Sequence, residues 1–343
     1  MHDRQAYILL TIDVEDWFQV ENFKRYIPFA SWSSYELRVE KNTHRLLDLL
    51  DSISVKQSLI DNQHLVTSSK QPDFSIHELK SKVQNSASRT KYLKPSNSKN
   101  PINPTNTINT KNSPKGTFFV LGWIAERLPH LVQEIHSRGH EVASHGYLHN
   151  MSNKQSYEDL KKGFGCSKKL LEDITGSPVY GLRTPNFSIS DDILKIIEEC
   201  GYLYDSSFNS FVMHSRYGQI ELSQSVRNGI AVKISDKFYE LPISNLKFAH
   251  QVFPWGGGGY FRLIPLFLFK RGVRSILEKE KVYLFYFHPW EIDPEQPKVN
   301  QASSFYKFRH YINLNKTYSK LAKLIGSFRH HRFLTCKQYL DEL

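Results

Sequence analysis

Cysteine is scarce in this sequence of 343 residues, which contains only Cys166, Cys200 and Cys336. The three are far apart and no Cys-x-x-Cys pair occurs, so neither a disulfide framework nor a thiolate metal site is expected. Long apolar runs are also missing, because the richest stretch, residues 261–269, is much shorter than the ~20 residues of a membrane-spanning helix. A signal peptide has a basic segment followed by an apolar one, and the N-terminus of this sequence lacks that pattern. These absences predict a cytoplasmic protein with reduced thiols and no transmembrane segment.

The formal charge of +11 is concentrated in one part of the sequence. Residues 56–115 contain ten Lys/Arg and three Asp/Glu, which leaves an excess of only four positive charges for the rest of the chain. No Arg-rich helix or aromatic RNA-binding signature accompanies the charge, so nucleic acid is not an expected partner. The sequence gives no indication of oligomeric state.

The same segment interrupts the pattern of helices and strands. Residues 56–115 are rich in Ser, Asn, Lys and Pro, and residues 94–114 have almost no apolar side chains. Such a stretch buries too little surface to offset its chain entropy, so we predict a disordered, basic insertion. The predicted organisation is therefore one domain made of residues 1–55 and 116–343, the latter including a C-terminal extension, with residues 56–115 inserted into it.

Outside the insertion, continuously apolar strands alternate with amphipathic helices, which is typical of an α/β fold with a parallel sheet. The expected strands are residues 7–12, 116–122, 141–144, 179–183 and 281–287, and the expected helices are residues 42–50, 124–138, 157–174, 191–200 and 314–328. Polar residues follow four of these strands, namely Asp13, His145, Arg183 and His288. Because chemistry in parallel α/β folds takes place at the C-terminal strand ends, these four side chains are expected on one rim.

The pair His145 and His149 has the i, i+4 spacing that places two imidazoles on one side of a helical turn. That arrangement suits two ligands of one metal ion. Alone it is a weak signal in a chain with 15 histidines.

Three carboxylates strengthen the hypothesis of a metal site. Asp13, Glu15 and Asp16 stand together at the end of a buried strand, where grouping them without a cation is costly. One of them would be the third metal ligand and another a general base acting on water. The alternative is a solvated acidic strand end.

Two further residues fit hydrolytic chemistry. Arg183 is followed by a turn whose conformation a proline restricts, and it is well placed to pair with the base carboxylate. His288 ends an aromatic strand and could protonate a leaving amine, and the alternative is a histidine that only packs in the core. Trp290 could stack on a sugar ring or pack in the core.

Taken together, these motifs resemble the polysaccharide deacetylase family with the NodB homology domain. Four pieces match in order: residues 11–16, residues 144–149, residues 183–185 and residues 287–289. Residues 13–18, 256–262 and 288–291 further resemble a subfamily associated with exosortase-linked exopolysaccharide gene clusters. The resemblance covers residues 7–55 and 116–335, and implies a distorted (β/α) barrel of about seven strands.

The resemblance assigns roles to individual residues. Asp13 corresponds to the catalytic base, Arg183 to the residue that tethers it, and His288 to the catalytic acid. His145 and His149 correspond to ligands of one divalent metal ion, with zinc expected and cobalt, nickel or manganese as alternatives. The third ligand stays open. Strand alternation favours Glu15, whereas adjacency and shorter reach favour Asp16, to which we give a slight preference.

The implied activity is removal of N-acetyl groups from an amino sugar of a polysaccharide or oligosaccharide. A groove lined by Trp17, Tyr147, Tyr260 and Trp290 would favour such a carbohydrate substrate. The metal and a backbone N–H near Asn186 would stabilise the oxyanion. A closed, small pocket would favour another non-peptide C–N bond instead. A non-catalytic carbohydrate-binding protein is the remaining alternative. The insertion joins a helix to the next strand, a connection that lies opposite the active site in such folds, so the catalytic rim should survive it.

Overall fold

The computed structural model describes residues 6–68, 113–211, 217–222, 225–249 and 251–343. The predicted low-complexity segment falls mainly on residues 69–112, which lie outside the described residues. Met1–Ile53 and Ser113–Leu343 form one compact unit, and Ser54–Asn112 form a second. The fold and the site below belong to the first unit.

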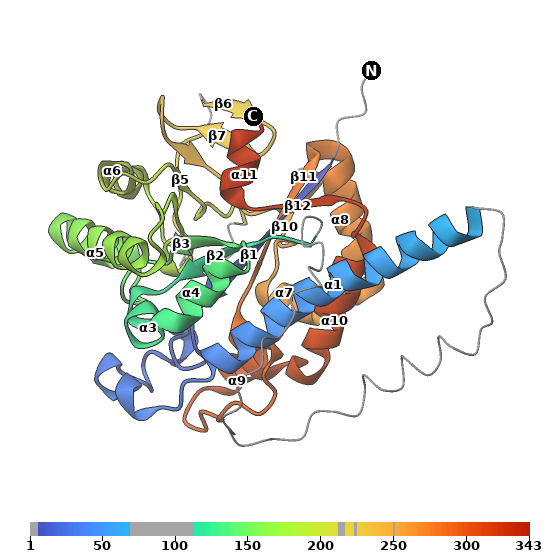
Figure 1. The fold of residues 1–343 in the computed structure, drawn as a ribbon. Coiled ribbons are helices and arrows are strands. Elements are labelled where there is room, and N and C mark those ends of the chain that lie inside the picture. The colour runs from blue at the N-terminus through green and yellow to red at the C-terminus, as the bar shows by residue number, and fades with distance from the viewer. Residues whose placement is uncertain (1–5, 69–112, 212–216, 223–224, 250) are drawn as a thin grey trace, which may run out of the picture. The chain divides into compact units, whose positions relative to one another are not determined.

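A curled sheet forms the centre of this unit (Figure 1). Its strands follow the order β11-β1-β2-β3-β4-β5-β8-β7-β6, and the seven from β11 to β8 are parallel. This confirms the predicted α/β fold with about seven parallel strands. The strands are β1 (Tyr7–Val14), β2 (Thr117–Val120), β3 (Glu141–Ser144), β4 (Gly181–Leu182), β5 (Tyr204–Asp205), β6 (Val226–Asn228), β7 (Ala231–Lys233), β8 (Tyr239–Glu240), β11 (Val282–Phe287) and β12 (Arg332–Leu334), of which β12 pairs with β1.

Strand β1 pairs with β11, β2 and β12 and is buried on both faces. Every residue from Ile8 to Val14 is buried, as the continuous run of apolar side chains predicts. Its register with β11 pairs Ile12 with Phe287, and its register with β2 pairs Asp13 with Phe119. The ends of β1 and β11 therefore lie side by side, which brings Asp13 and His288 to one edge.

Helices surround the sheet, with α3 to α6 on the left of Figure 1 and α8 and α10 on the right. The predicted helix 124–138 is divided at Leu128, because Pro129 has no N–H to continue the first helix and begins the second. The helices are α1 (Val39–Ser68), α3 (Gly122–Arg127), α4 (Pro129–Ser137), α5 (Tyr157–Thr175), α6 (Asp191–Glu199), α7 (Gly258–Leu263), α8 (Leu266–Glu280), α9 (Ser304–Tyr311), α10 (Leu314–Ser327) and α11 (Cys336–Asp341).

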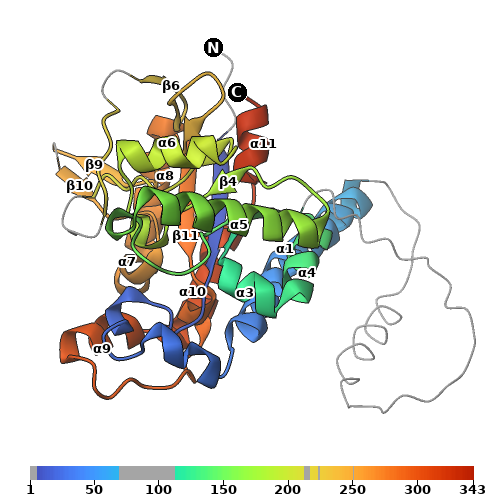
Figure 2. The ribbon, with the colours of Figure 1, turned by 90° about the vertical axis from the view of Figure 1, so that its left-hand side faces the viewer.

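The region from 201 to 280, in which no helix or strand is expected from the sequence, contains short strands and two helices. Strands β5 to β8 extend the sheet, and a separate hairpin is formed by β9 (Leu246–Phe248) and β10 (Gln251–Phe253). Helices α7 and α8 follow the hairpin, and Figure 2 shows α7 and the hairpin along one edge of the domain. Within the described residues, no helix combines the length and apolarity that a bilayer-spanning segment needs.

Candidate functional site

The C-terminal strand ends surround a small cavity of about 130 Å³. Asp13 lies at the end of β1, His145 directly after β3 and His288 directly after β11. The cavity is lined by Asp13, Glu15, Val20, Glu21, Asn22, His145, His149, Thr184, Asn186, Phe187, Tyr217, Tyr286, His288, Trp290 and Arg309. The expected rim of polar strand-end residues is therefore present.

Glu15, His145 and His149 form a buried cluster with the composition of a metal site. Their ligand atoms all lie within 4.8 Å of one another, and each residue is at most 5% exposed. The Nδ1 of His145 lies 2.8 Å from the backbone oxygen of Arg183, so Nδ1–H donates and Nε2 keeps its lone pair for a metal. Two nitrogens and one carboxylate oxygen are a ligand set typical of catalytic zinc.

The protonation of the cluster suits a cation. Burial lowers the pKa of His145 to about 4, so its ring is neutral at pH 7 as a metal ligand must be. Burial raises the pKa of Glu15, but the interactions with His149, and after it with His288 and His145, outweigh burial and hold the pKa well below its usual range. Glu15 Oε2 lies 2.5 Å from His149 Nε2, yet it is buried and accepts no well-aligned hydrogen bond from the described residues. The short distance between these two atoms is explained if both direct a lone pair at one cation. The three residues therefore fit a divalent metal.

The loop that carries both histidines is not helical, so the predicted helical turn was wrong. Gly146 adopts a φ of +73°, which reverses the chain directly after His145. The backbone oxygens of Gly146 and Tyr147 accept hydrogen bonds from Gly122 and Trp123 at the start of α3. These bonds hold the loop so that the two imidazole centroids lie 5.6 Å apart.

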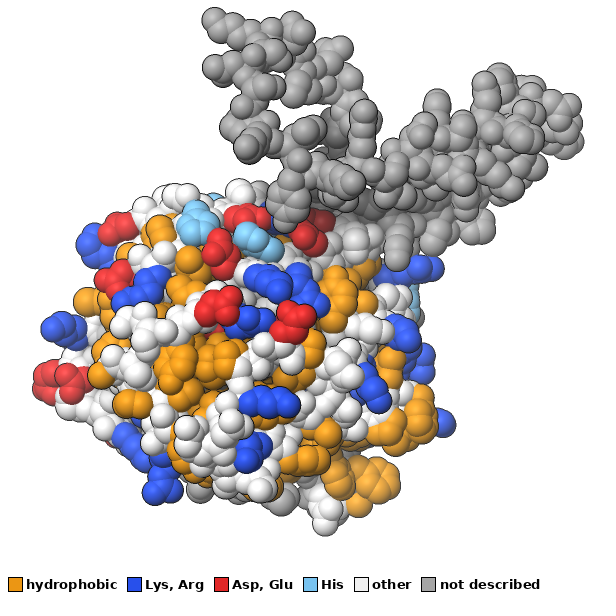
Figure 3. Space-filling view, turned by 90° about the horizontal axis from the view of Figure 1, so that it is seen from below, with side chains coloured by type: hydrophobic (Ala, Val, Ile, Leu, Met, Phe, Trp, Pro, Cys, Tyr) orange, Lys and Arg blue, Asp and Glu red, His pale blue; other side chains and the backbone are white. Residues whose placement is uncertain are grey.

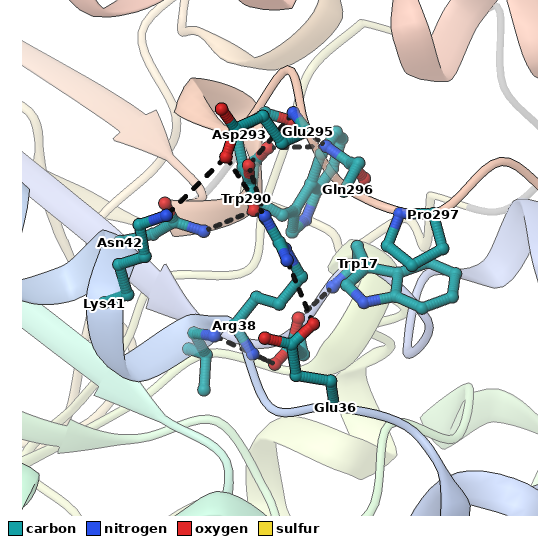
Figure 4. A network of polar contacts seen from close by, with 12 residues as sticks. Trp17, Glu36, Arg38, Lys41, Asn42, Trp290, Asp293, Glu295, Gln296 and Pro297 are labelled. Carbon is teal, nitrogen blue, oxygen red and sulfur yellow. Dashed lines mark hydrogen bonds and ion pairs between the residues drawn. The ribbon is translucent and has the colours of Figure 1, made fainter.

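Asp16, which we slightly preferred as the third ligand, lies outside the cluster. Its Oδ1 accepts a hydrogen bond from the N–H of Trp17, and its Oδ2 accepts bonds from the N–H groups of Arg38 and Val39. Asp16 thus caps the first turn of α1, and burial, opposed by these bonds, raises its pKa to about 6. Figure 4 shows the adjoining network, in which the guanidinium of Arg38 pairs with Asp293. The geometry therefore favours Glu15 over Asp16 as a ligand.

Arg183 holds Asp13 as the sequence predicts. Its Nη1 donates to Asp13 Oδ1 at 2.7 Å and to Thr11 Oγ1 at 2.8 Å, and the side chain is fully buried. Its other two nitrogens donate to the backbone oxygen and the hydroxyl of Ser206, which follows β5. One guanidinium therefore joins three strand ends and leaves Asp13 Oδ2 directed at the cavity.

His288 faces Asp13 and is oriented by a second carboxylate. Its Nε2 lies 3.7 Å from Asp13 Oδ2, while Nδ1 lies 2.8 Å from Glu291 Oε1. Glu291 is fully buried and accepts a hydrogen bond of 2.7 Å from Arg262 Nε. Burial lowers the pKa of His288, but Glu15, Glu291 and Asp13 together raise it to about 9. His288 therefore carries a proton at neutral pH, as a general acid requires.

Trp290 contributes to the site through its edge and not through its faces. Its ring stacks between the imidazoles of His288 and His310, with centroids 5.3 and 4.3 Å away. Its Nε1 donates to Glu15 Oε1 at 3.0 Å. Both faces are covered, so the predicted stacking on a sugar ring is blocked, and Trp290 instead positions a candidate metal ligand.

This contact predicts the effect of replacing Trp290 with phenylalanine. Phe keeps the stacked ring but removes the N–H that orients Glu15, so metal affinity should fall by about 10- to 100-fold, as expected when a partner of a ligand is lost. Titration of metal-free protein with zinc, followed by calorimetry, measures the change. An unchanged affinity would mean that the indole only fills space.

The other three predicted aromatic residues do not line the cavity. Trp17 is 2% exposed and packs edge-on against Phe18 and Tyr35. Tyr147 lines a separate hollow beside α5, and Tyr260 packs edge-on against Phe211. Asn186 does line the cavity, and its Nδ2 is buried without a hydrogen-bond partner among the described residues.

Several residues of the site were not singled out from the sequence. Glu291 and Arg262 were noticed only as parts of motifs, although the spacing of His288 and Glu291 across a proline was the available signal. Tyr286 and Phe187 line the cavity and contact each other edge-on. Arg309, on α9, comes from a region with no recognisable motif.

A buried acid pair supports the strand that carries Arg183. Asp205 and Glu240 are neighbours in the β5–β8 register, and Asp205 accepts hydrogen bonds from the N–H and hydroxyl of Ser207. The Ser207 Oγ accepts a bond from the N–H of Thr184, next to Arg183. Burial raises the pKa of both carboxyls, and that of Glu240 lies well above its usual value because Asp205 adds negative charge.

Replacing Glu240 with glutamine should make the protein less sensitive to rising pH. A folded-state pKa raised above the ordinary 4.5 means that Glu240 contributes stability below about pH 4.5 that is lost as pH rises through the raised value. Glutamine keeps a donor towards Asp205 and an acceptor for the N–H of Phe208, but cannot ionise. The melting temperature of Glu240→Gln should match the wild type in acid and exceed it at alkaline pH. If the melting temperatures of both proteins fell equally as the pH rises, Glu240 would not be the group whose ionisation destabilises the fold.

Comparison with known families agrees with this arrangement. Residues 105–204 match the family model described as polysaccharide deacetylase, and residues 206–341 match a model described as a domain of unknown function, DUF3473. Residues 105–204 are therefore similar to polysaccharide deacetylases.

Individual relatives match shorter regions. A peptidoglycan-N-acetylglucosamine deacetylase of Bacillus cereus is 32% identical over 88 residues, which are 26% of this chain and 41% of that protein. A peptidoglycan deacetylase-like protein of Gibberella zeae is 30% identical over 95 residues, 28% of each protein. The chain thus spans less than half the length of these relatives. The crystal structure of a putative polysaccharide deacetylase from Mycobacterium smegmatis aligns with a TM-score of 0.51 and 15% identity, covering all of this chain and 91% of that one, and shares its fold.

Proposed function

We propose that this protein is a metal-dependent carbohydrate N-deacetylase that hydrolyses the N-acetyl group of an amino sugar. The observation that carries the proposal is the pair formed by Asp13 and His288, whose Oδ2 and Nε2 lie 3.7 Å apart beside the cluster of Glu15, His145 and His149. A carboxylate and a protonated imidazole bordering one cavity form an acid–base pair for amide hydrolysis.

In the proposed reaction, Asp13 accepts a proton from the attacking water, whose oxygen bonds to the acetyl carbon. Arg183 keeps the Asp13 carboxylate in position throughout. The C–N bond then breaks while His288 gives its proton to the departing nitrogen, so that acetate and a free amine result. A divalent metal held by Glu15, His145 and His149 would polarise the acetyl carbonyl and the attacking water. We propose zinc as this metal, because the ligand set suits it.

Asn186 is proposed to stabilise the oxyanion through its side-chain amide. Its Nδ2 borders the cavity and has no hydrogen-bond partner among the described residues. Asn186→Ala should therefore lower kcat by about 10²- to 10³-fold with a smaller change in KM, because the donor acts mainly in the transition state. Steady-state kinetics measure both constants, and a change confined to KM would assign Asn186 to ground-state binding.

A second candidate, hydrolysis of another non-peptide C–N bond in a small molecule, is favoured by one observation. The cavity is only about 130 Å³, and Trp17, Tyr147 and Tyr260 do not line it. The match of residues 105–204 to the polysaccharide deacetylase model and the acid–base pair support the carbohydrate substrate, which we therefore place first.

Acetate release from N-acetylglucosamine oligomers, measured together with metal content, tests the proposal. Metal-dependent release that stops after chelation and returns with added zinc would support it. Bound metal without release from any N-acetylated sugar, but with turnover of a small amide or ureide, would favour the second candidate. Bound metal with no turnover would point to a carbohydrate-binding role.

We propose exopolysaccharide biosynthesis in the cytoplasm as the setting. The support is the resemblance of residues 13–18, 256–262 and 288–291 to the exosortase-associated subfamily, together with the expectations drawn from the sequence. Cell fractionation, and the acetylation state of the secreted polymer in a deletion strain, test this assignment.

A further inference from the structure

Exposed apolar side chains are concentrated around the start of α8. Of the large hydrophobic side chains that are exposed among the described residues, five fall between residues 248 and 268. They are Phe248, Phe253, Leu263, Phe267 and Leu268, and the most exposed are Phe248 at 71% and Phe267 at 64%. An apolar group of this size on a water-facing surface marks an interaction site.

The hairpin that carries Phe248 and Phe253 packs beside α8. Phe253 pairs with Leu246 across the hairpin, and Phe248 lies two residues from Leu246, so the three share one face. Leu246 packs against the core, and Trp255, just after β10, stacks on Phe269 of α8. The two phenylalanines of the hairpin therefore project beyond the core next to α8, where Phe267 is exposed.

Cations continue the same surface along α8. Lys270, Arg271 and Arg274 follow Phe267 at helical spacing and line a shallow hollow with it. None of the three forms an ion pair with another described residue, although Arg274 lies over the ring of Phe328. One acidic residue, Glu278, borders the hollow a turn further on. Figure 3 shows charges of both signs among the hydrophobic side chains of the lower face.

We infer that this α8 patch (Phe248, Phe253, Leu263, Phe267, Leu268, Lys270, Arg271 and Arg274) docks on an anionic lipid surface. Apolar side chains flanked by unpaired cations match the layout of a bilayer interface, where rings enter the acyl boundary and cations meet the headgroups. The inference is independent of the proposed enzymatic function, because no residue of the patch lines the catalytic cavity.

Sedimentation of the full chain with lipid vesicles tests the inference. Binding is expected to vesicles containing phosphatidylglycerol, to weaken with salt, and to be much weaker with phosphatidylcholine alone. The variant R271E/R274E should reduce binding by at least about tenfold, since each cation near an anionic surface contributes independently. F248S/F267S should also reduce binding, but with little change in salt dependence.

The matched control is K169E/K195E, which makes the same change in net charge on α5 and α6. It should bind nearly as the wild type does. Equal losses in both charge variants, or retention in both, would overturn the inference, because binding would then follow net charge or another surface. No binding to anionic vesicles by a wild-type protein that is folded by circular dichroism would also overturn it and would point to a protein partner.

Discussion

Asp13→Asn should lower kcat for acetate release by about 10²- to 10⁴-fold, the range that a positioned general base contributes. Asparagine keeps an oxygen that can accept the hydrogen bond from Arg183 Nη1, so the side chain should hold its position. It cannot accept the proton of water, so the loss should appear in kcat. Stopped assays of acetate against substrate concentration separate kcat from KM.

Metal content is the control for this variant, because Asp13 is not one of the three clustered ligand residues. Asp13→Asn should retain metal while losing activity. Arg183 is fully buried and loses its ionic partner, so a lower melting temperature is also expected. An Asp13→Asn protein that keeps full turnover would assign the base to another group and remove the basis for the proposed mechanism.

Glu15→Ala should remove the bound metal, whereas Asp16→Asn should keep the metal and lower the stability of the fold. Removal of Glu15 deletes a ligand oxygen. The metal affinity should therefore fall by more than the ~10- to 100-fold that is expected when a partner of a ligand is lost. Asp16→Asn should retain metal but lower the free energy of unfolding by about 1–3 kcal/mol, because an amide that keeps its oxygen on Trp17 places an N–H against the N–H groups of Arg38 and Val39.

Metal analysis after gel filtration and urea unfolding measure the two quantities on the same preparations. Glu15→Gln is a useful companion, since it keeps the volume of the side chain and an acceptor for Trp290. If Asp16→Asn lost the metal and Glu15→Ala kept it, the ligand assignment would be reversed.

The sequence was sufficient to place the four strand-end residues, because a parallel sheet fixes where its strands end. Asp13, His145, Arg183 and His288 follow apolar runs long enough to recognise, and the sheet brings them to one edge. The sequence did not decide in the same way whether Glu15 or Asp16 is the third candidate ligand. Strand alternation did favour Glu15, but the partners that occupy Asp16 are backbone groups about twenty residues away.

The predicted aromatic lining of the cavity was wrong for a related reason. Trp17 is covered by Tyr35, which lies in a segment without helical or strand periodicity, so its burial cannot be inferred locally. Likewise β5 and β8 have only two residues each, too few for a periodic pattern. Their position in the sheet depends on long-range pairing, and Ser206 follows β5 while Glu240 ends β8.

One peptide bond separates Glu15 from Asp16, and the two carboxylates point to different parts of the molecule. Glu15 belongs to the candidate metal cluster, whereas Asp16 caps the helix that starts at Val39. A metal ion held by Glu15 and the first turn of α1 would thus be fixed by adjacent residues, and binding of the ion only to the folded chain would add to its stability by mass action. Chelation should therefore be visible as earlier melting of the whole domain, and a fluorescent reporter on the first turn of α1 would register the ion without any substrate present.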